Sequence, residues 1–196
     1  MTKNELRALI RRRRERIADE DFQRLNHSLH RRLLSDADLR QARTVLVYWS
    51  FGREVETHEL FRHLVSATRV DTIILPDSSG KDADPDKFRV WRRPATKSLP
   101  AVSPDDLPIE GPEILDSVDV ALIPGLAYDL MGNRLGQGSG YFDKVLSRLP
   151  RQAVKLGLGF EFQIFSELPR DSWDVPVHRI ASETRIIRVS HLHRPA

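Results

Sequence analysis

The hydrophobic positions of the first 43 residues recur at the spacing of two amphipathic helices. Apolar side chains return every three or four residues with arginines between them, and an acidic break at 19–21 separates two such stretches. The first stretch carries Leu6, Leu9, Ile10 and Ile17, and the second carries Phe22, Leu25, Leu29 and Leu33. The pattern therefore predicts an N-terminal helical segment over residues 1–43.

Continuous apolar runs follow this segment and predict strands that are buried on both faces. The runs cover residues 44–49, 70–75, 118–123 and 155–160. Between the first two, Thr57 is placed to cap a helix whose apolar stripe is Leu60, Phe61, Leu64 and Val65. Residues 139–149 carry another stripe, Phe142, Val145, Leu146 and Leu149, and predict a further helix.

Alternating strands and helices are typical of βαβ units, so the fold class predicted is α/β. We expect a layered, open and mostly parallel sheet that is flanked by helices. A chain of 196 residues fits a single domain spanning 1–196. Residues 77–113 are rich in Pro, Asp and Lys around a short apolar piece at 88–91, and are expected to form an excursion from the sheet.

Composition and charge narrow the function classes. The chain has no cysteine, which excludes disulfides, thiolate nucleophiles and Cys-ligated metals. No apolar run approaches the roughly 18 residues of a membrane span, and no apolar segment follows the basic N-terminus, so a cytoplasmic protein is expected. The net charge of +3 is unevenly distributed: residues 1–43 hold 12 Lys and Arg against 7 Asp and Glu, whereas residues 44–196 hold 19 against 21. A basic segment of this kind fits an anionic partner or the solvated face of a helix.

Five of the ten glycines fall between Gly125 and Gly140, after a predicted buried strand and before a predicted helix. Alternate glycines let the backbone approach an anion, and the helix N-terminus offers unpaired N–H groups. The spacing G-x-G-x-G matches neither the Rossmann nor the Walker pattern. The spacing alone leaves a flexible turn and a phosphate cradle equally open, but ligands usually bind at the carboxyl end of such a strand.

Four charged residues are candidates for chemistry near this loop. Arg134 could pair with phosphate oxygens and Asp143 could hold Mg²⁺, although a surface arginine and a helix-capping aspartate have the same pattern. Glu54 follows the first strand and could accept hydrogen bonds from an amine-bearing ring, but its local pattern favours an acidic residue that precedes the helix capped by Thr57. Asp174 is ambiguous by itself. The spacing of the histidines gives no metal site, and no hydrolase motif is present.

At these positions the chain resembles the 5-formyltetrahydrofolate cyclo-ligases, also called 5,10-methenyltetrahydrofolate synthetases. The most specific match is Ile123-Pro-Gly-Leu-Ala-Tyr-Asp129 followed by Gly132-Asn-Arg-Leu-Gly-Gln-Gly-Ser-Gly-Tyr-Phe-Asp143. Supporting matches are Lys3-x-x-Leu6-Arg7, Glu54-Val-Glu-Thr57, Leu75-Pro76, Leu158–Gln163 and Asp174-Val-Pro176. Together they cover nearly the whole chain.

The resemblance implies an ATP- and Mg²⁺-dependent ligase that converts 5-formyltetrahydrofolate to 5,10-methenyltetrahydrofolate, with release of ADP and phosphate. In the family, the formyl oxygen attacks the γ-phosphate and N10 of the folate then displaces the phosphate, without a protein nucleophile. The ATP-binding residues implied are Lys3, Arg7, Arg134, Leu135, Gly136, Gln137, Gly138, Ser139, Gly140 and Tyr141. Those implied for the folate are Glu54 and Tyr141, and those for the metal are Asp143 and Asp174.

The chain departs from the family pattern at Phe142, Lys144, Phe160 and Glu161, where Tyr, Arg, Tyr and Asp are expected. Two other functions stay open, a non-catalytic relative and a basic nucleic-acid-binding protein. Intact Lys3, Arg134, Asp143 and Glu54 argue against the first, and the absence of aromatic residues within Arg11–Arg14 argues against the second. We expect a monomer without a nucleic-acid or membrane partner, in which most of Arg11–Arg14 forms a solvated helix face.

Overall fold

The computed structural model describes residues 1–67, 69–77, 83–94 and 103–189, and their main sheet has the strand order β11-β10-β8-β5-β1-β2-β3-β4. Its parallel strands are β1 (Thr44–Val47), β2 (Thr72–Pro76), β5 (Val120–Pro124), β8 (Val154–Leu158) and β10 (Arg179–Ala181). Antiparallel strands extend both edges: β3 (Phe88–Arg92) and β4 (Ile109–Glu110) at one, and β11 (Ile186–Arg188) at the other.

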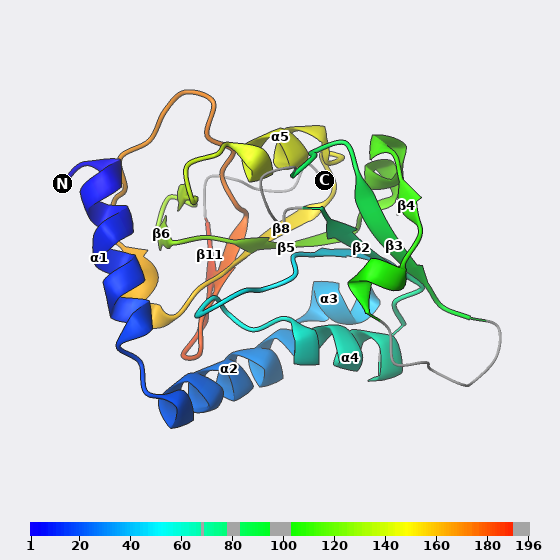
Figure 1. Ribbon diagram of the computed structural model, residues 1–196, viewed down its shortest axis with the longest axis horizontal. Coiled ribbons are helices and arrows are strands. Elements are labelled where there is room, and N and C mark those ends of the chain that lie inside the picture. Colours follow the sequence, from blue (N-terminus) through cyan, green and yellow to red (C-terminus); the bar gives the residue numbers. More distant parts are fainter. Residues whose placement is uncertain (68, 78–82, 95–102, 190–196) are drawn as a thin grey trace.

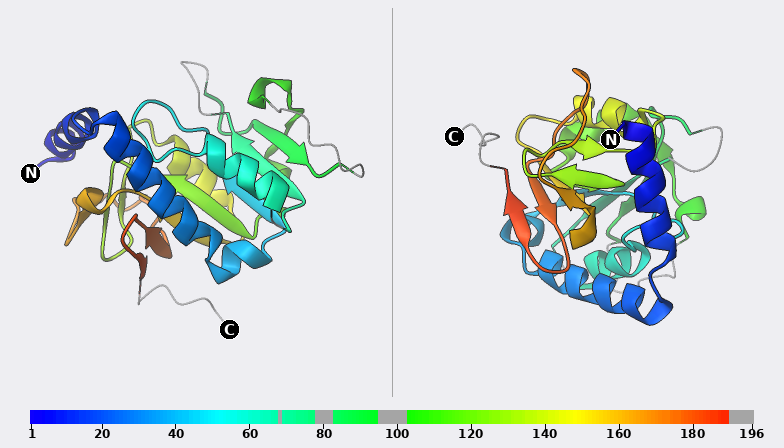
Figure 2. Two further views of the ribbon diagram at one scale, coloured as in Figure 1. Left: turned by 90° about the horizontal axis from the view of Figure 1, so that it is seen from below. Right: turned by 90° about the vertical axis from the view of Figure 1, so that its left-hand side faces the viewer.

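The α-helices are α1 (Lys3–Glu15), α2 (Asp19–Leu34), α3 (Ala37–Gln41), α4 (His58–Ala67) and α5 (Tyr141–Arg148). All of them except α1 cover the two faces of this sheet (Figure 1, Figure 2). Short 3₁₀ helices occupy Pro104–Asp106, Pro112–Ser117 and Glu161–Gln163. Figure 1 shows α2, α3 and α4 below the sheet and α5 above it. The predicted fold class, a mostly parallel sheet flanked by helices with an N-terminal helical segment, is confirmed. Among the described residues, no helix is long and apolar enough to cross a membrane.

The continuous apolar runs of the central strands arise because alternate side chains enter two different cores. In β1, Val45 and Val47 belong to the cluster that contains Leu60 of α4, whereas Leu46 belongs to the cluster that contains Val145 of α5. Successive side chains of a strand point to opposite faces, so a strand covered on both faces must be apolar at every position.

The segment 77–113 differs from its prediction as an excursion from the sheet. It contains β3 and β4, which pair antiparallel to β2 and to each other and so lengthen the sheet. The apolar piece at 88–91 is therefore a sheet strand, while the parts of this segment at 78–82 and 95–102 lie outside the described residues.

A small second sheet positions α1 at the carboxyl end of β5. It consists of β6 (Ala127–Asp129), β7 (Arg134–Leu135) and β9 (Ile164–Phe165). Leu6 and Ile10 of α1 pack with Leu126, Ala127 and Leu135 in one hydrophobic cluster. As a result α1 stands across one end of the main sheet, apart from the layer formed by α2–α4 (Figure 2).

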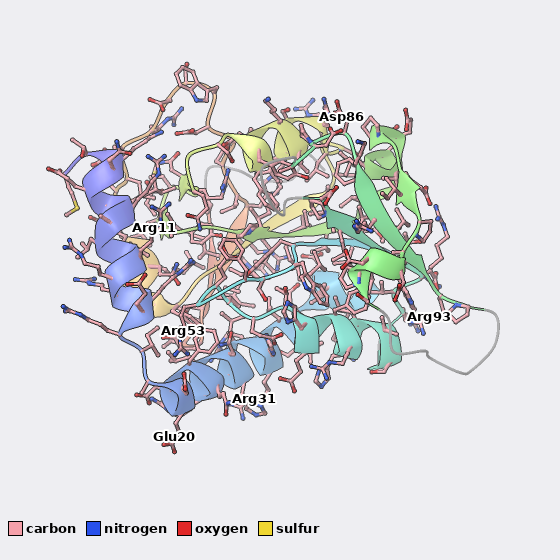
Figure 3. The ribbon with its side chains drawn as sticks, in the orientation of Figure 1. Arg11, Glu20, Arg31, Arg53, Asp86 and Arg93 are labelled. Atoms are coloured by element: carbon pink, nitrogen blue, oxygen red, sulfur yellow. The ribbon has the colours of Figure 1, made fainter. Side chains whose placement is uncertain are left out.

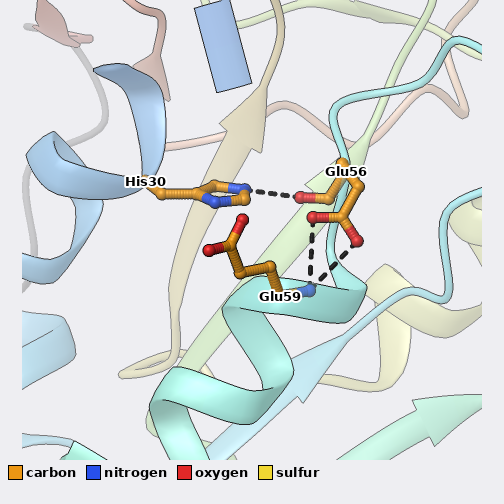
Figure 4. Close-up of side chains that lie close together, drawn as sticks. All are labelled: His30, Glu56 and Glu59. Carbon is orange, nitrogen blue, oxygen red and sulfur yellow. Dashed lines mark hydrogen bonds between the residues drawn. The ribbon is translucent and has the colours of Figure 1, made fainter. Parts of the chain in front are cut away.

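Three residues, His30, Glu56 and Glu59, lie together between α2 and the start of α4 (Figure 4). The ring of buried His30 donates from Nε2 to the backbone carbonyl of Glu56 at 2.6 Å. The Glu56 carboxylate accepts from the backbone N–H groups of His58 and Glu59, at 2.5 and 3.0 Å. Glu56 thus caps the first turn of α4, and the prediction that Thr57 caps it with its side chain is wrong.

The Thr57 hydroxyl instead donates to the carbonyl of Tyr48 at 2.6 Å, which connects the helix start to the residue that follows β1. Ligand atoms of His30, Glu56 and Glu59 lie within 4.8 Å of one another, a spacing that a metal ion could use. Because the His30 Nε2 and the Glu56 carboxylate already have backbone partners, we assign this cluster a structural role.

Candidate active site

The order of the parallel strands reverses between β1 and β5, because the chain passes from β1 to β2 on one side and from β5 to β8 on the other. Such a switch point opens a crevice at the carboxyl ends of the two strands. A cavity of about 1010 Å³ lies there. Every residue that the resemblance implies for ATP, folate or metal lines it: Lys3, Arg7, Glu54, Arg134, Leu135, Gly136, Gln137, Gly138, Ser139, Gly140, Tyr141, Asp143 and Asp174.

The glycine loop forms one wall of this cavity and leads from β7 into α5. Gly138 and Gly140 have φ angles of 113° and 69°, a conformation that favours glycine. Gly140 is the N-cap of α5 and has no side chain to bond the first N–H groups of the helix. Helix α5 begins at Tyr141, two residues later than predicted. The N–H of Tyr141 donates to Oγ of Ser139 at 3.4 Å, and because the N-cap residue bonds none of the following N–H groups, these can face an anion.

Arg134 and Asp143 pair across the glycine loop, with Nη2 of the arginine 2.8 Å from Oδ1 of the aspartate. The guanidinium carbon also lies 5.9 Å from the ring centroid of Phe142. A Cβ atom on Gly136 would come within 2.7 Å of Arg134 Nη1, so glycine leaves room for the guanidinium. Nε of Arg134 is buried and has no hydrogen-bond partner within the described structure.

Lys3 forms the second ion pair of the cavity. Its Nζ lies 2.7 Å from Oδ2 of Asp171 and 2.8 Å from Oδ2 of Asp174. Burial acts to raise the pKa of Asp174, but hydrogen bonds from the backbone of Asp171 and from Lys3 outweigh it, and the pKa falls below its usual value. Asp174 therefore stays a carboxylate at neutral pH.

Arginines of α1 reach the same loop. Arg7 donates from Nε to the carbonyl of Gly136 at 3.0 Å, and Arg11 donates to Oε1 of Gln137 at 2.8 Å. Arg11 is labelled on α1 in Figure 3. The expected solvated face therefore holds only for exposed Arg12 and Arg13, because Arg11 contacts the loop and Arg14 is buried.

Glu54 is 6% exposed and faces the cavity from the loop after β1. Its carboxylate accepts from Nε2 of Gln137 and from the backbone N–H of Phe51, both at 3.4 Å. Burial raises the pKa of this carboxyl, and the positive charge of Arg14, whose Nη1 lies 4.0 Å from Oε1, opposes the rise.

Aromatic side chains complete the cavity. Tyr141 is mostly buried and donates its hydroxyl to the carbonyl of Asp84 at 3.3 Å, and burial raises the pKa of its phenol. Phe51 and Trp173 line the cavity while remaining 68% and 70% exposed. Flat apolar rings at the opening of a cavity can stack on a heterocyclic ligand.

The four departures from the family pattern have different surroundings. Phe142 lies beside the Arg134 guanidinium and lines the cavity. Phe160 is fully buried in the main core, and Lys144 is exposed on α5. Glu161 accepts hydrogen bonds from Ser182, Thr184 and Arg185. Of these positions only Phe142 touches the cavity.

Sequence reasoning missed several charged residues near the site, among them Arg14 and Asp171. Arg14 follows Leu6 and Ile10 at four-residue spacing. Its position in the apolar stripe of α1 is a sequence pattern that could have predicted its burial. Asp171 lies in an irregular segment, and no local pattern ties it to Lys3, which is 168 residues away.

Comparison with known proteins finds the same family by sequence. A 5-formyltetrahydrofolate cyclo-ligase of Escherichia coli (strain K12) is 28% identical over 185 residues, which cover 91% of this chain and 98% of that protein. One of Mus musculus is 27% identical over 191 residues, which cover 92% of this chain and 93% of that protein.

Solved structures agree. The NMR structure of Aquifex aeolicus 5,10-methenyltetrahydrofolate synthetase has a TM-score of 0.76 at 30% identity, over 96% of this chain and 93% of that one. A 5,10-methenyltetrahydrofolate synthetase from Mycoplasma pneumoniae has a TM-score of 0.72 at 22% identity, over 93% and 99% of the two chains, and so shares the fold. Residues 1–183 match the model of the 5-formyltetrahydrofolate cyclo-ligase family, and the chain belongs to that family.

Proposed function

We propose that this protein is an ATP- and Mg²⁺-dependent ligase that converts 5-formyltetrahydrofolate to 5,10-methenyltetrahydrofolate, with release of ADP and phosphate. The observation that carries the proposal is the cavity at the switch point. It brings a glycine loop and the cations Lys3, Arg7 and Arg134 together with the ion-paired carboxylates of Asp143 and Asp174 and the buried carboxylate of Glu54. Family membership supplies the reaction class.

The glycine loop and the cations fit the phosphates of ATP. The open N-terminus of α5 supplies backbone N–H groups, and Lys3, Arg7 and Arg134 supply positive charge around the same space. Gly136 keeps the Arg134 guanidinium at the loop, and the buried Nε of that arginine still has a proton to donate. Phosphoryl transfer depends mostly on positioning and charge neutralisation, which this arrangement provides.

Asp143 and Asp174 fit a magnesium ion, because Mg²⁺ prefers one or two carboxylates and fills its shell with water and phosphate oxygens. Each carboxylate is now held by a cation, Arg134 or Lys3, that we also assign to phosphate. The carboxylates could therefore exchange these partners for the metal while the cations turn to the phosphates. Bound Mg²⁺ would neutralise phosphate charge during transfer.

The chemistry proposed needs no protein nucleophile. The formyl oxygen forms a bond to the γ-phosphorus as the bond to ADP breaks. N10 then attacks the formyl carbon, the carbon–oxygen bond breaks, phosphate leaves with the former formyl oxygen, and the N10 proton goes to solvent. Phosphorylation is needed because an amide-like carbon has a poor leaving group. The enzyme holds both substrates in line and neutralises the charge.

Glu54 and Tyr141 are the residues we assign to the folate. Glu54 offers a largely buried acceptor to ring N–H and amino groups, and Tyr141 brings a hydroxyl to the same cavity. Charged hydrogen bonds of this kind orient a ring more strongly than neutral ones do.

We further propose a monomer, since all the residues assigned to ATP, metal and folate come from one chain. The contacts of the basic segment argue against a nucleic-acid-binding protein. Arg7 and Arg11 bond to the glycine loop, and Arg14 is buried against Gly125, so α1 does not present a continuous basic face.

The test is an assay of purified protein with ATP, Mg²⁺ and 5-formyltetrahydrofolate, followed by the absorbance of the methenyl product. We expect product only when all three are present. A non-catalytic relative would bind ATP or folate without forming product. A nucleic-acid-binding protein would instead bind oligonucleotides with a steep salt dependence and leave the folate unchanged.

A further inference from the structure

Helix α1 carries a charged residue in its apolar stripe. The buried residues of the helix are Leu6, Ile10 and Arg14, which follow one another at four-residue spacing on one face. Leu6 and Ile10 pack into a hydrophobic cluster, whereas Arg14 is 5% exposed. A buried guanidinium is costly unless it is paired, so an arginine at an apolar position calls for a specific partner.

The Arg14 guanidinium contacts two partners. Nη2 donates to the carbonyl of Gly125, directly after β5, at 2.5 Å, and Nη1 lies 4.0 Å from Oε1 of Glu54. Glu54 lines the cavity, but Arg14 does not. The arginine therefore stands behind the carboxylate and acts on a ligand only through it.

The surroundings of Glu54 supply little other positive charge. Its remaining hydrogen bonds come from Gln137 and from the Phe51 backbone, both long at 3.4 Å. Two phenols also interact electrostatically with it, Tyr48, which follows β1, and Tyr128 of β6. Burial raises the pKa of both phenols, which keeps them neutral. Arg11 reaches Gln137 and not Glu54.

We propose that Arg14 is a positioning residue for the folate: it holds the Glu54 carboxylate at the end of β5 and supplies the positive charge that keeps it an ionised acceptor inside the cavity. This proposal rests on the proposed function, in which Glu54 binds the folate ring. A purely structural Arg14 would affect stability alone. A positioning Arg14 also sets the pH at which folate binding fails.

The direction of the pH effect follows from the charges. Burial raises the pKa of Glu54 and Arg14 counteracts it, so removal of Arg14 raises the pKa further. Glu54 then gains a proton at a higher pH, and binding that needs the carboxylate is lost earlier as the pH falls. The acid limb of kcat/KM for the folate should move upward.

The experiment compares Arg14→Met with Arg13→Met, which removes the same charge from the exposed neighbouring position. Methionine suits the apolar stripe and should preserve α1. We expect the acid limb of Arg14→Met to rise by about one pH unit, a tenfold loss of kcat/KM on that limb. The limb of Arg13→Met should match the wild type, as should KM for ATP in both variants.

A second variant, Glu54→Gln, keeps the proposed role of Arg14 falsifiable even if Arg14→Met does not fold, because it tests whether Glu54 is the titrating group. It should weaken folate binding and abolish the acid limb, since the titrating group is gone. An unmoved limb in Arg14→Met, or an unchanged limb in Glu54→Gln, overturns the role of Arg14.

Failure of the proposed function has a different signature, because the wild type itself would then form no methenyl product. In that case, calorimetric binding of 5-formyltetrahydrofolate across the same pH range tests Arg14 directly. An upward shift of the binding midpoint in Arg14→Met supports the proposal, and wild-type behaviour or absence of folate binding by the wild type rejects it.

Discussion

Oppositely charged side chains in the cavity are paired with each other where phosphate and metal are expected to bind. Lys3 holds Asp174, and Arg134 holds Asp143. Such pairs keep partly buried charges neutralised before a ligand arrives.

Asp129, at the start of the glycine-rich stretch, has a structural role instead. Its carboxylate accepts from the backbone N–H groups of Met131, Asn133 and Leu168 and so secures the small sheet.

Because we assign Lys3 to the phosphates of ATP, the variant Lys3→Gln should bind ATP more weakly. Loss of a charge-assisted phosphate contact costs about 1.5–3 kcal/mol, so KM for ATP should rise roughly 10- to 100-fold. Arg12→Gln is the matched control, because it removes the same charge from an exposed position of α1. Steady-state kinetics with ATP varied provides the measurement, and equal effects of the two variants would mean that Lys3 acts through net charge alone.

The variant Asp129→Ala tests the structural role of this carboxylate through the stability of the protein. It removes a fully buried carboxylate and leaves several N–H groups without an acceptor, at about 3 kcal/mol or more of unfolding free energy. Denaturant unfolding measures the loss. Stability within about 0.5 kcal/mol of the wild type would contradict the structural role given to Asp129.

In the glycine loop, two glycines are needed for different reasons. Gly136 has an ordinary backbone conformation but no room for a Cβ beside Arg134, whereas Gly140 has a φ of 69° and open space around it. The first glycine serves the approach of a side chain, and the second serves the turn into α5.

The two glycines should respond differently to alanine. Gly136→Ala displaces the Arg134 guanidinium and should raise KM for ATP severalfold with little loss of stability. Gly140→Ala meets no atom within 4 Å but strains the backbone, at about 1 kcal/mol of unfolding free energy. Thermal unfolding and ATP kinetics on both variants check the contrast, which an identical response of the two would refute.

At the scale of the whole molecule, α1 and the switch point of the sheet together enclose the site. Local patterns were enough to predict α1, β1, β5 and the glycine loop, because each has its own period or residue type. They were not enough for β10 and β11, for the join of β3 to the sheet, or for the contact of Lys3 with Asp171. Those depend on pairing between distant segments, which leaves no local pattern.

Binding of Mg²⁺–ATP should stabilise α1 specifically, because we assign Lys3 and Arg7 of this helix to the phosphates. These contacts would add to the hydrophobic packing of the helix and to its hydrogen bonds with the glycine loop. Hydrogen exchange should slow in residues 3–15 when the nucleotide is present. Helix α2, which does not line the cavity, serves as the internal control. Equal slowing of both helices would indicate a general effect of the nucleotide and not specific contacts between α1 and the phosphates.

In the reaction that we propose, ATP activates the formyl oxygen, and this oxygen leaves as part of the phosphate. One measurement tests it: turnover of 5-formyltetrahydrofolate labelled with oxygen-18 in the formyl group, with ATP and Mg²⁺, followed by mass spectrometry of the released phosphate. We expect one labelled oxygen in the phosphate for each methenyl product formed. Product formation with unlabelled phosphate, or no product at any Mg²⁺ concentration, would contradict it.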